Sequence, residues 1–462
     1  MAPIGTWQRR AQRSPMRKSR FAAAGPPPLC VAQSPRAARR YRRWPMVLAL
    51  TALLASRAGG LRADTVAIAC GSVGIEFQLC REAATAWASR TGHTVRMIST
   101  PNDANERLAL FQQLLAARSA DIDVFQIDVV WPGILAPFLL DLAPHFSSDE
   151  IAGHFSILIA NNRVGGRLVA MPWFADAGLL YFRRDLLEKY KVEVPRNWQQ
   201  LTDTARLIQD GERAGGRARM WGYVWQGRAY EGLTCNALEW IHSAGGGAIV
   251  DAAGKVTVDN PSAAAALQLA APWIGTITPP GVLNYTEEEA RGVFQSGDAA
   301  FMRNWPYALA LAGAPGSPVA GRIGVAALPH GEDGASSATL GGSQLAVSRY
   351  SRAPAAAIDL VRALSGAKEQ KRRAIAGGFN PTIERLYRDP ELLAARHLMP
   401  ELKAIFAAAV ARPSAVTGRR YNQVSNEFWN AVHDVLRGRQ SAPASLAALA
   451  KRLRFLSRGE KW

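Results

Sequence analysis

The 462 residues exceed what one hydrophobic core organises, so we expect two or three compact units. The formal net charge is +18 at pH 7, but the first 63 residues hold 13 Lys and Arg and neither Asp nor Glu, which leaves +5 (18 less 13) for the rest. The basic character therefore belongs to the N-terminal segment, which argues against nucleic-acid binding by the body of the chain.

The N-terminal segment has the three parts of a secretory signal. Four arginines between residues 39 and 43 precede an apolar run, Met46 to Ala55, and small residues follow as far as Ala63. The apolar run is short for a membrane-spanning helix, so a membrane anchor is the less favoured alternative. We expect residues 1–63 to be a leader, a disordered basic extension plus a signal peptide, cleaved near Ala63–Asp64 to leave a periplasmic chain. The Sec and twin-arginine routes both stay open.

The cysteines and histidines indicate no metal chemistry. Cys30 would leave with the leader, and Cys70, Cys80 and Cys235 then allow at most one disulfide and one free thiol, with no pairing favoured. Cys/His spacings typical of a metal site do not occur in the sequence, so we expect neither a metal nor a cofactor.

Strand-like and helical patterns alternate through the mature chain. A helical stretch runs to Trp87, and a second helix is predicted over Glu106–Ala117, where Leu108, Phe111 and Leu115 repeat with a helical period. Such alternation predicts a mainly parallel sheet covered by helices. Strands are predicted at 65–70, 94–98, 124–127, 168–171, 299–302, 323–328 and 344–347, and helices at 184–191, from Pro195, and through most of the Ala-rich region after Pro354.

Three segments have the composition of crossings between two lobes, namely Pro172–Ala177, His330–Gly342 and Gly377–Pro381. A chain that crosses between two α/β lobes leaves a cleft at strand ends, where ligands bind in open α/β sheets. The predicted organisation is lobe I at 64–172 and 340–376, lobe II at 177–334 and 380–462, and hinge segments at 173–176, 335–339 and 377–379.

Several strands and early turns end in side chains suited to a neutral carbohydrate. Carboxylates accept hydrogen bonds from vicinal hydroxyls, arginine donates to ring and hydroxyl oxygens, and an indole stacks on the C–H face of a pyranose. The stretch RNWPY at 303–307 is interpreted as a binding wall in which Pro306 pre-places the rings. The candidates are Glu76, Arg107, Asp128, Asp176, Trp305 and Tyr307.

Each candidate also has a structural explanation. An Asp at a strand end often caps the next helix, and for Asp128 alone the two explanations weigh equally. Trp131 and Phe174 fit the core or the rim of a site. Core positions are the better explanation for the tryptophans in helical or apolar contexts: Trp87, Trp198, Trp221, Trp240, Trp273 and Trp429.

Seven stretches resemble the sugar-binding extracellular solute-binding proteins of ATP-binding-cassette (ABC) importers, closest to the trehalose/maltose-binding branch. They read DVFQIDVVWPGIL, VAMPWFADAGLLYFRRDLLEKY, VPRNWQQLTDTA, YEGLTCNALEW, FQSGDAAFMRNWPYA, ATLGGSQLAVS and ARPSAVTGRRYNQVS, and they span essentially the whole mature chain. The resemblance implies a monomeric α/β protein with the type II two-lobe periplasmic-binding-protein fold, each lobe a mainly parallel sheet flanked by helices. It also implies a hinge that closes on a di- or oligosaccharide and docking on the transmembrane permease subunits.

Position by position, the resemblance places sugar contacts at the six candidates above and at Gly342 and Arg412, with Glu231 and Tyr421 as further positions. Two residues depart from the family pattern. Many relatives have Trp where this chain has Ser343, and Tyr is common where it has Phe174. These two departures leave a different or larger ligand open as an alternative to the disaccharide that the resemblance implies.

The resemblance implies binding without catalysis. The alternative from another class is a secreted glycosidase, in which Asp128, Asp176 and Glu76 would supply the acid and base pair. A periplasmic iron or polyamine binder would need a Tyr/His cluster or an acidic cage, and neither pattern occurs in the sequence.

Overall fold

The computed structural model describes residues 63–71, 74–101, 104–314, 316–331, 334–396 and 398–462. All of them belong to the unit formed by residues 61–462. The predicted leader and Cys30 lie outside this part of the chain, apart from Ala63. Within the described residues, the helices lack the combined length and apolarity needed to span a bilayer.

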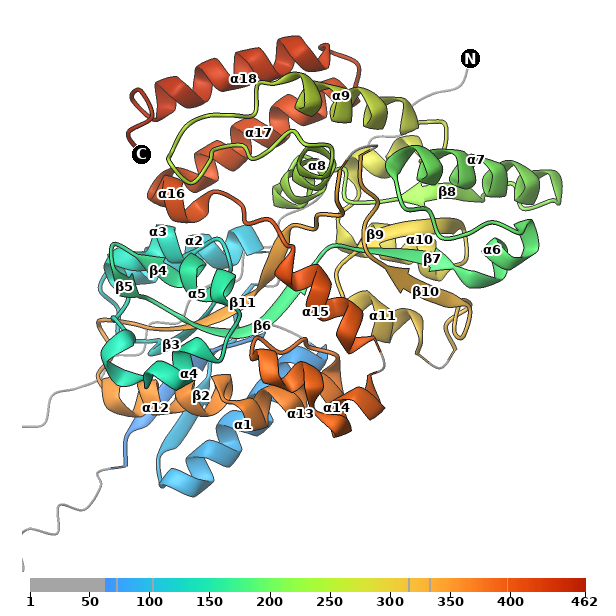
Figure 1. Cartoon of the computed structure of the whole chain (residues 1–462). Helices are drawn as coiled ribbons and strands as arrows, with labels where there is room; N and C mark the ends of the chain where they lie inside the picture. Colours follow the sequence, from blue (N-terminus) through green and yellow to red (C-terminus); the bar gives the residue numbers. More distant parts are fainter. Residues whose placement is uncertain (1–62, 72–73, 102–103, 315, 332–333, 397) are drawn as a thin grey trace, which may run out of the picture. The chain divides into compact units, whose positions relative to one another are not determined.

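The first sheet has the strand order β2–β1–β3–β11–β6 (Figure 1). Its strands are β1 Thr65–Ala69, β2 Thr94–Met97, β3 Val124–Asp128, β6 Met171–Ala177 and β11 Leu340–Val347. Strand β1 is parallel to β2 and β3, whereas β11 is antiparallel to β3 and β6. This sheet and the helices packed on it are called lobe I; they include α1 Gly74–Thr91, α2 Ala104–Ala116, α12 Pro354–Ser365 and α13 Ala367–Gly377.

The second sheet has the order β10–β7–β9–β8 (Figure 1). Its strands are β7 Leu179–Arg183, β8 Trp221–Val224, β9 Ala299–Asn304 and β10 Ile323–Ala326. Strand β7 is antiparallel to β9 and β10, and β8 is parallel to β9. This sheet and its helices are called lobe II; they include α7 Trp198–Ala214, α8 Glu231–Ser243, α9 Pro261–Ala270, α10 Glu287–Gln295, α17 Tyr421–Leu436 and α18 Ala442–Leu456.

Each sheet contains one reversed strand, and each reversed strand follows a crossing between the lobes. Strand β6 continues into β7 through the single residue Gly178, and residues 327–339 connect β10 to β11. Because the chain leaves one sheet and enters the other without turning back, the strand after each crossing runs against its neighbours. The remaining strands of each sheet share one direction, so the predicted two-lobe α/β fold with mainly parallel sheets is confirmed.

Shorter elements complete the described fold. The helices are α3 Pro132–Leu135, α4 Ser148–Ala152, α5 Ser156–Asn162, α6 Arg184–Tyr190, α11 Tyr307–Ala312, α14 Pro390–Ala395, α15 Met399–Ala407 and α16 Ser414–Thr417. A small hairpin joins β4 Arg163–Val164 to β5 Arg167–Leu168. Local signals set several ends: Asn197 caps α7 by accepting from the Gln200 N–H, and Thr286 with Glu289 forms a capping box on α10.

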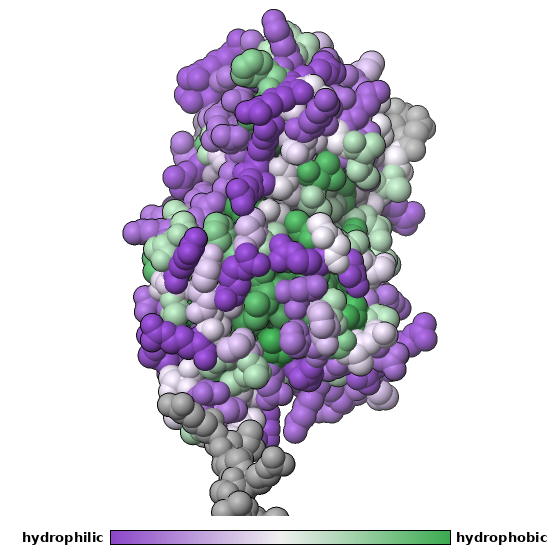
Figure 2. Space-filling model, turned by 90° about the vertical axis from the view of Figure 1, so that its left-hand side faces the viewer, coloured by the Kyte–Doolittle hydropathy of each residue, from purple (hydrophilic) through white to green (hydrophobic). Residues whose placement is uncertain are grey.

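Apolar side chains pack on both faces of the first sheet and around the second. Four of the tryptophans predicted to be core, Trp87, Trp198, Trp240 and Trp273, are at most 2% exposed. Trp221 and Trp429 are only partly buried. On the face shown in Figure 2 polar side chains cover most of the area and apolar ones gather near the middle. The large apolar side chains exposed in the described part of the chain are Ile75, Leu207, Leu311, Ile375 and Phe455.

The segment Pro172–Ala177, predicted to be a crossing, is itself most of strand β6. Its side chains are buried except for Asp176, and its backbone pairs with β11. Pro172 lies on an edge strand of the sheet and beside the irregularity between Ser343 and Gln344, both of which are places where a proline is tolerated. The predicted strand 168–171 is wrong, since β5 ends at Leu168 and β6 begins at Met171.

Other strand boundaries also differ from the prediction. Strand β9 extends to Asn304, so Arg303 belongs to a buried strand and not to a loop. Strand β11 begins at Leu340, four residues earlier than predicted, and β7 and β8 were missed because runs of five and four residues carry little periodicity. Whether the predicted hinge segments bend stays a prediction.

The described residues contain three cysteines. Cys70 and Cys80 form a disulfide, and Cys235 is a free, buried thiol. The expectation of at most one disulfide is confirmed, and the structure selects its pairing. The bridge ties the residue after β1 to α1, the helix that carries Glu76. Desolvation raises the pKa of the Cys235 thiol to about 12, so it is a protonated core group.

Candidate functional site

Lobe I presents polar side chains where its strands end. Asp128 is the last residue of β3 and pairs across the sheet with Ser343 of β11. Gln126, two residues earlier, donates through Nε2 to Glu76 Oε1 (2.6 Å) and to Ser343 Oγ (2.9 Å). Its own Oε1 accepts from the Gly71 N–H. Gln126, which the sequence reading missed, therefore holds the Glu76 carboxylate beside the strand ends.

Arg107 lies on α2 near the same strand end. Its Cζ is 5.6 Å from the centroid of the Trp131 ring, and its Nε is buried with no hydrogen-bond partner among the described residues. Burial raises the pKa of Asp128, although the charges of Arg412 and Arg107 oppose that rise. Asp128 Oδ1 accepts from the Val130 N–H at 3.0 Å, and α3 begins after Trp131 without a side-chain cap. Asp128 thus closes a turn and does not cap α3.

Asp176 lies on β6, opposite Gly341 of β11. Desolvation raises its pKa to about 8, and the negative charges of Glu76 and Asp128 add to the rise, against the opposing charge of Arg396. Glu76 and Asp128 therefore both lie close enough to Asp176 for their charges to act on it, and the three predicted carboxyl groups are called the carboxylate cluster. At neutral pH most Asp176 side chains carry a proton and have a hydrogen bond to donate.

Arg412 connects the two lobes. Its Nη1 donates to Glu231 Oε1 in the first turn of α8 (2.7 Å), and its Nη2 donates to the Leu340 carbonyl at the start of β11 (3.2 Å). Nη2 also lies 3.7 Å from Asp128 Oδ1. The side chain is only 3% exposed, so this guanidinium joins β3, β11 and α8 in a nearly buried cluster.

Glu231 and Tyr421 are placed behind Arg412. The Glu231 carboxylate accepts from Ser425 Oγ at 2.7 Å and from the Tyr421 hydroxyl, in addition to Arg412. Tyr421 is 1% exposed, and its ring packs in the core. Glu231 therefore holds Arg412 directly, and Tyr421 supports it indirectly through its hydrogen bond to the Glu231 carboxylate.

Lobe II brings Trp305 against the β11 strand of lobe I. The indole Nε1 donates to Glu287 Oε1 (3.2 Å), and the Arg303 guanidinium stacks on the ring with its Cζ 4.1 Å from the centroid. A Cβ at Gly341 would lie 2.8 Å from the indole Cζ3, so glycine leaves the room that the ring occupies. Because Gly341 pairs with Asp176 on the neighbouring strand, the Trp305 indole lies next to the part of the sheet that carries the Asp176 carboxyl.

Tyr307 is the first residue of α11, two residues after Trp305. Its hydroxyl donates to Glu288 Oε1 at 2.6 Å, and burial followed by this hydrogen bond raises its pKa. Gly342 has φ +110°, and a Cβ there would lie 2.2 Å from the Phe174 carbonyl oxygen. Only glycine fits this position in the strand, whatever its role in binding.

The predicted site residues do not include Gln126, Arg303, Glu239 and Arg396, although Arg303 belongs to the RNWPY stretch interpreted as a binding wall. For two of these residues, the sequence holds a signal that could have identified them. Gln126 interrupts the apolar run of β3, and Glu239 sits between Leu238 and Trp240 in an otherwise apolar helix. A polar residue at a buried position needs a partner, and that need marks it as a candidate.

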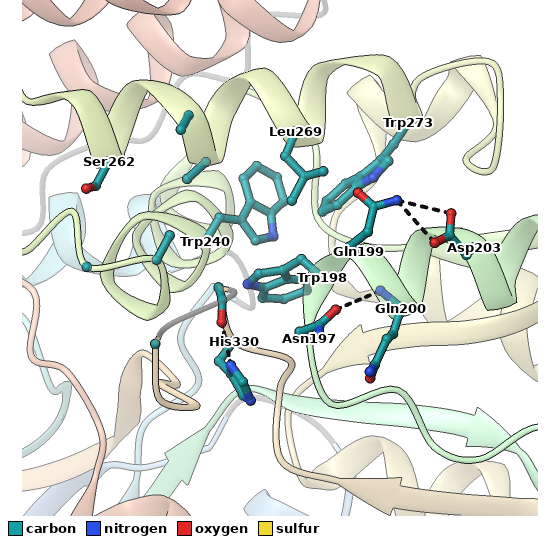
Figure 3. Close-up of a pocket in the computed structure, with 16 residues that line it drawn as sticks. Asn197, Trp198, Gln199, Gln200, Asp203, Trp240, Ser262, Leu269, Trp273 and His330 are labelled. Atoms are coloured by element: carbon teal, nitrogen blue, oxygen red, sulfur yellow. Dashed lines mark hydrogen bonds between the residues drawn. The ribbon is translucent and has the colours of Figure 1, made fainter.

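A separate cavity of about 730 Å³ lies in lobe II, between the start of α7, the end of α8 and α9 (Figure 3). Its lining includes Trp198, Trp240 and Trp273, which are nearly fully buried. The indole nitrogens of Trp198 and Trp273 donate to Ser243 and Thr202. These rings are core side chains, and the predicted site residues do not line the cavity.

Residues 76–371 match the family described as bacterial extracellular solute-binding protein. The chain belongs to this family. Among its relatives, a Deinococcus radiodurans protein named "Probable ABC transporter-binding protein" is 50% identical over 422 residues, which cover 91% of this chain and all of the relative.

Solved structures of solute-binding proteins share the fold. The structure titled "Maltose bound T. maritima MalE3" is 39% identical, has a TM-score of 0.79, and matches 85% of this chain and 100% of its own. The GacH receptor of Streptomyces glaucescens, described without ligand and with acarbose, is 24% identical with a TM-score of 0.75 over 86% of this chain and 99% of its own. At that identity the second match supports the fold alone. Together with the family match, they confirm the family and fold indicated by the sequence motifs.

Proposed function

We propose that this solute-binding protein is the periplasmic component of an ABC sugar importer. It captures a di- or oligosaccharide of the maltose or trehalose type between its lobes and delivers it to the transmembrane permease subunits. In this proposal it acts as a monomer and without a cofactor. The maltose-bound T. maritima relative, at 39% identity, supports the ligand class.

The observation that carries the proposal is the meeting of the Trp305 indole with the carboxylate cluster. The indole reaches the strand position opposite Asp176, and Glu76 and Asp128 lie within electrostatic range of that carboxyl. A pyranose has an apolar face and a rim of hydroxyls. An aromatic wall beside several hydrogen-bonding groups suits that shape.

The roles assigned to the ten predicted residues follow from how their polar atoms are used. Glu76 and Asp128 accept from hydroxyls, while protonated Asp176 donates to a sugar oxygen. Arg107, with its partnerless Nε, and Arg412 supply further donors. Trp305 and Tyr307 cover the apolar face, and Gly342 lets the backbone approach. Glu231 and Tyr421 act indirectly, by holding Arg412.

The direct test is thermal unfolding of the mature protein with maltose, trehalose, maltotetraose and glucose, with an equal concentration of glycerol as control. A ligand bound only by the folded state raises the melting temperature, and 100 times its Kd contributes about 2.7 kcal/mol. We expect at least one of the oligosaccharides to raise it more than glucose does. No shift with any saccharide would contradict the proposal.

A second test concerns movement of the lobes. The crossings at Gly178 and at residues 327–339 are single passes of chain, which suits a hinge. The radius of gyration from small-angle scattering should fall when the stabilising sugar is added. An unchanged value at saturation would show that the sugar binds without closure.

The rival function is a glycosidase, favoured by one observation: the raised pKa of Asp176 beside Asp128 suits an acid and base pair. Incubation of pure protein with maltose separates the two. We expect no glucose above the rate of buffer alone. Glucose release that disappears in Asp176→Asn would establish the rival.

A further inference from the structure

Arg303 and Glu239 form a fully buried ion pair between β9 and α8. Arg303 Nε is 2.9 Å from Glu239 Oε2, and Nη2 is 2.5 Å from Oε1, so the guanidinium is held by a two-pronged contact. Both side chains are at most 1% exposed. The Arg303 Nη1 also donates to Gln226 Oε1 at 3.3 Å. The plane of the guanidinium is thereby fixed.

The same pair touches two of the segments that cross between the lobes, called here the first crossing (Gly178) and the second crossing (residues 327–339). The Thr339 N–H, in the second crossing, donates to Glu239 Oε1 at 3.0 Å, and the Thr339 hydroxyl donates to the Cys235 carbonyl one turn earlier on α8. In the first crossing, a Cβ at Gly178 would lie 2.2 Å from Glu239 Oε1 and 2.7 Å from Arg303 Nη2. The ion pair thus occupies the point where the two passes of chain enter lobe II.

The other side of Arg303 faces Trp305. Its Cζ lies 4.1 Å from the indole centroid, close enough for a cation–π contact that burial of the guanidinium strengthens. One face of the ring is therefore occupied by a fixed cation. Trp305 Nε1 is tied to Glu287, and the ring edge fits against Gly341, two residues after Thr339. The indole is held by the same groups that contact the crossings.

Stability alone does not explain a buried ion pair, because apolar residues of similar volume are often equally stable. What an apolar pair lacks is orientation. A guanidinium held by two hydrogen bonds has one plane, and a ring stacked on it has one tilt. Lysine would keep the charge but would lose both the fork and the flat stacking surface.

We propose that Arg303 and Glu239 are positioning residues, which fix the Trp305 indole relative to the first and second crossings. Through this ion pair, binding of a ligand against the indole is linked to closure of the lobes. The link to binding rests on the proposed function, because it assumes that Trp305 contacts a sugar. The placement of the indole by Arg303 is independent of that assumption. Arg303 acts through Trp305 and does not touch the ligand.

The test compares Arg303→Lys and Glu239→Gln with a matched control, Arg183→Lys. Arg183 is also a buried arginine of lobe II, held in a fork by Asp185 at 2.8 and 2.6 Å, and it lies on β7 with no contact to Trp305 among its hydrogen bonds and ring contacts. The readouts are maltose affinity by calorimetry, melting temperature, and the fluorine NMR resonance of Trp305 in protein labelled with fluorotryptophan. Trp305→Phe assigns that resonance.

We expect Arg303→Lys and Glu239→Gln to weaken maltose binding about tenfold, and to move or broaden the Trp305 resonance in the absence of sugar. Arg183→Lys should lower the melting temperature but leave both the affinity and the Trp305 resonance near those of the wild type. If Arg303→Lys does not fold, Glu239→Gln, which keeps the volume of the side chain, decides the comparison.

An unmoved Trp305 resonance in both variants would overturn the inference. Equal affinity losses in Arg303→Lys and Arg183→Lys would also overturn it, because the loss would then follow from general destabilisation. If the wild type does not bind maltose, the proposed sugar is wrong, and the Trp305 resonance alone decides whether Arg303 sets the indole. The two failures are therefore distinguishable.

Discussion

The two sides of the candidate site differ in how their polar atoms are used. On lobe II the aromatic groups have partners: Trp305 Nε1 donates to Glu287, and the Tyr307 hydroxyl donates to Glu288. On lobe I, burial raises the pKa values of Asp128 and Asp176, and a buried nitrogen of Arg107 lacks a partner among the described residues. The polar atoms of these lobe II rings are thus paired, whereas lobe I keeps one buried nitrogen without a partner and two carboxyls of raised pKa.

This difference suggests a division of work. A wall whose rings are already held in place offers a rigid apolar surface, and its binding costs little ordering entropy. A wall with unused hydrogen-bonding capacity gains most when a ligand supplies the missing partners. We therefore expect changes on lobe II to cost affinity, and changes on lobe I to alter pH dependence and choice of sugar.

The largest expected effect concerns Glu231, which joins the walls by holding Arg412. Glu231→Gln leaves the nearly buried Arg412 without its closest counter-charge, and we expect a loss of about 3–5 kcal/mol in the free energy of unfolding. Urea titration measures it. Glu427→Gln, which breaks a more exposed pair with Arg452, should cost less than about 1 kcal/mol. Equal costs for the two variants would show that Arg412 does not depend on Glu231.

Truncation of the aromatic wall comes next. Trp305→Ala should cost about 2–4 kcal/mol of sugar-binding free energy, because in the proposed site the ring covers the sugar face, while the melting temperature changes little. The matched core variant Trp273→Ala should instead lose about 3–5 kcal/mol of folding free energy. If Trp305→Ala instead lowers the melting temperature strongly and leaves the sugar affinity normal, the indole is a core side chain and not part of the binding site.

The third prediction uses the pKa of Asp176, raised from 3.8 to about 8. Between these values the folded state keeps a proton that the unfolded state releases, so the free energy of unfolding falls as the pH rises from about 4 to about 8. Asp176→Asn should remove the contribution of this carboxyl to that fall, up to about 1.4 kcal/mol per pH unit. Urea titrations across this pH range test it. Parallel profiles for the two proteins would mean that Asp176 titrates normally.

The smallest effect is expected for Tyr307→Phe. This change removes only the hydroxyl that donates to Glu288, and we expect a cost of about 0.5–1.5 kcal/mol in folding stability. Sugar affinity should change by less than about threefold, since the ring stays. Calorimetry and thermal unfolding of the same preparation measure both. A larger loss of affinity would mean that the hydroxyl itself meets the ligand.

Local sequence patterns were sufficient for the elements whose burial follows a period. The helical stripe of Leu108, Phe111 and Leu115 predicted α2, and the apolar runs before Cys70 and Asp128 predicted β1 and β3. The alternation of these elements predicted the α/β class. These signals are readable because each arises from one element burying one face against its neighbours.

The sequence by itself determined the family, the two-lobe fold and the residue types that a sugar site needs, because motifs and periodicity are written in neighbouring residues. Only the tertiary structure decided which polar groups remain available. The Glu231 carboxylate has committed hydrogen bonds because Arg412 and Tyr421, 181 and 190 residues further along the chain, lie beside it. Arg303, expected in a loop, is buried because Glu239 meets it from another helix. The cost of burying a charge depends on its partners in space, and spacing along the chain does not reveal them.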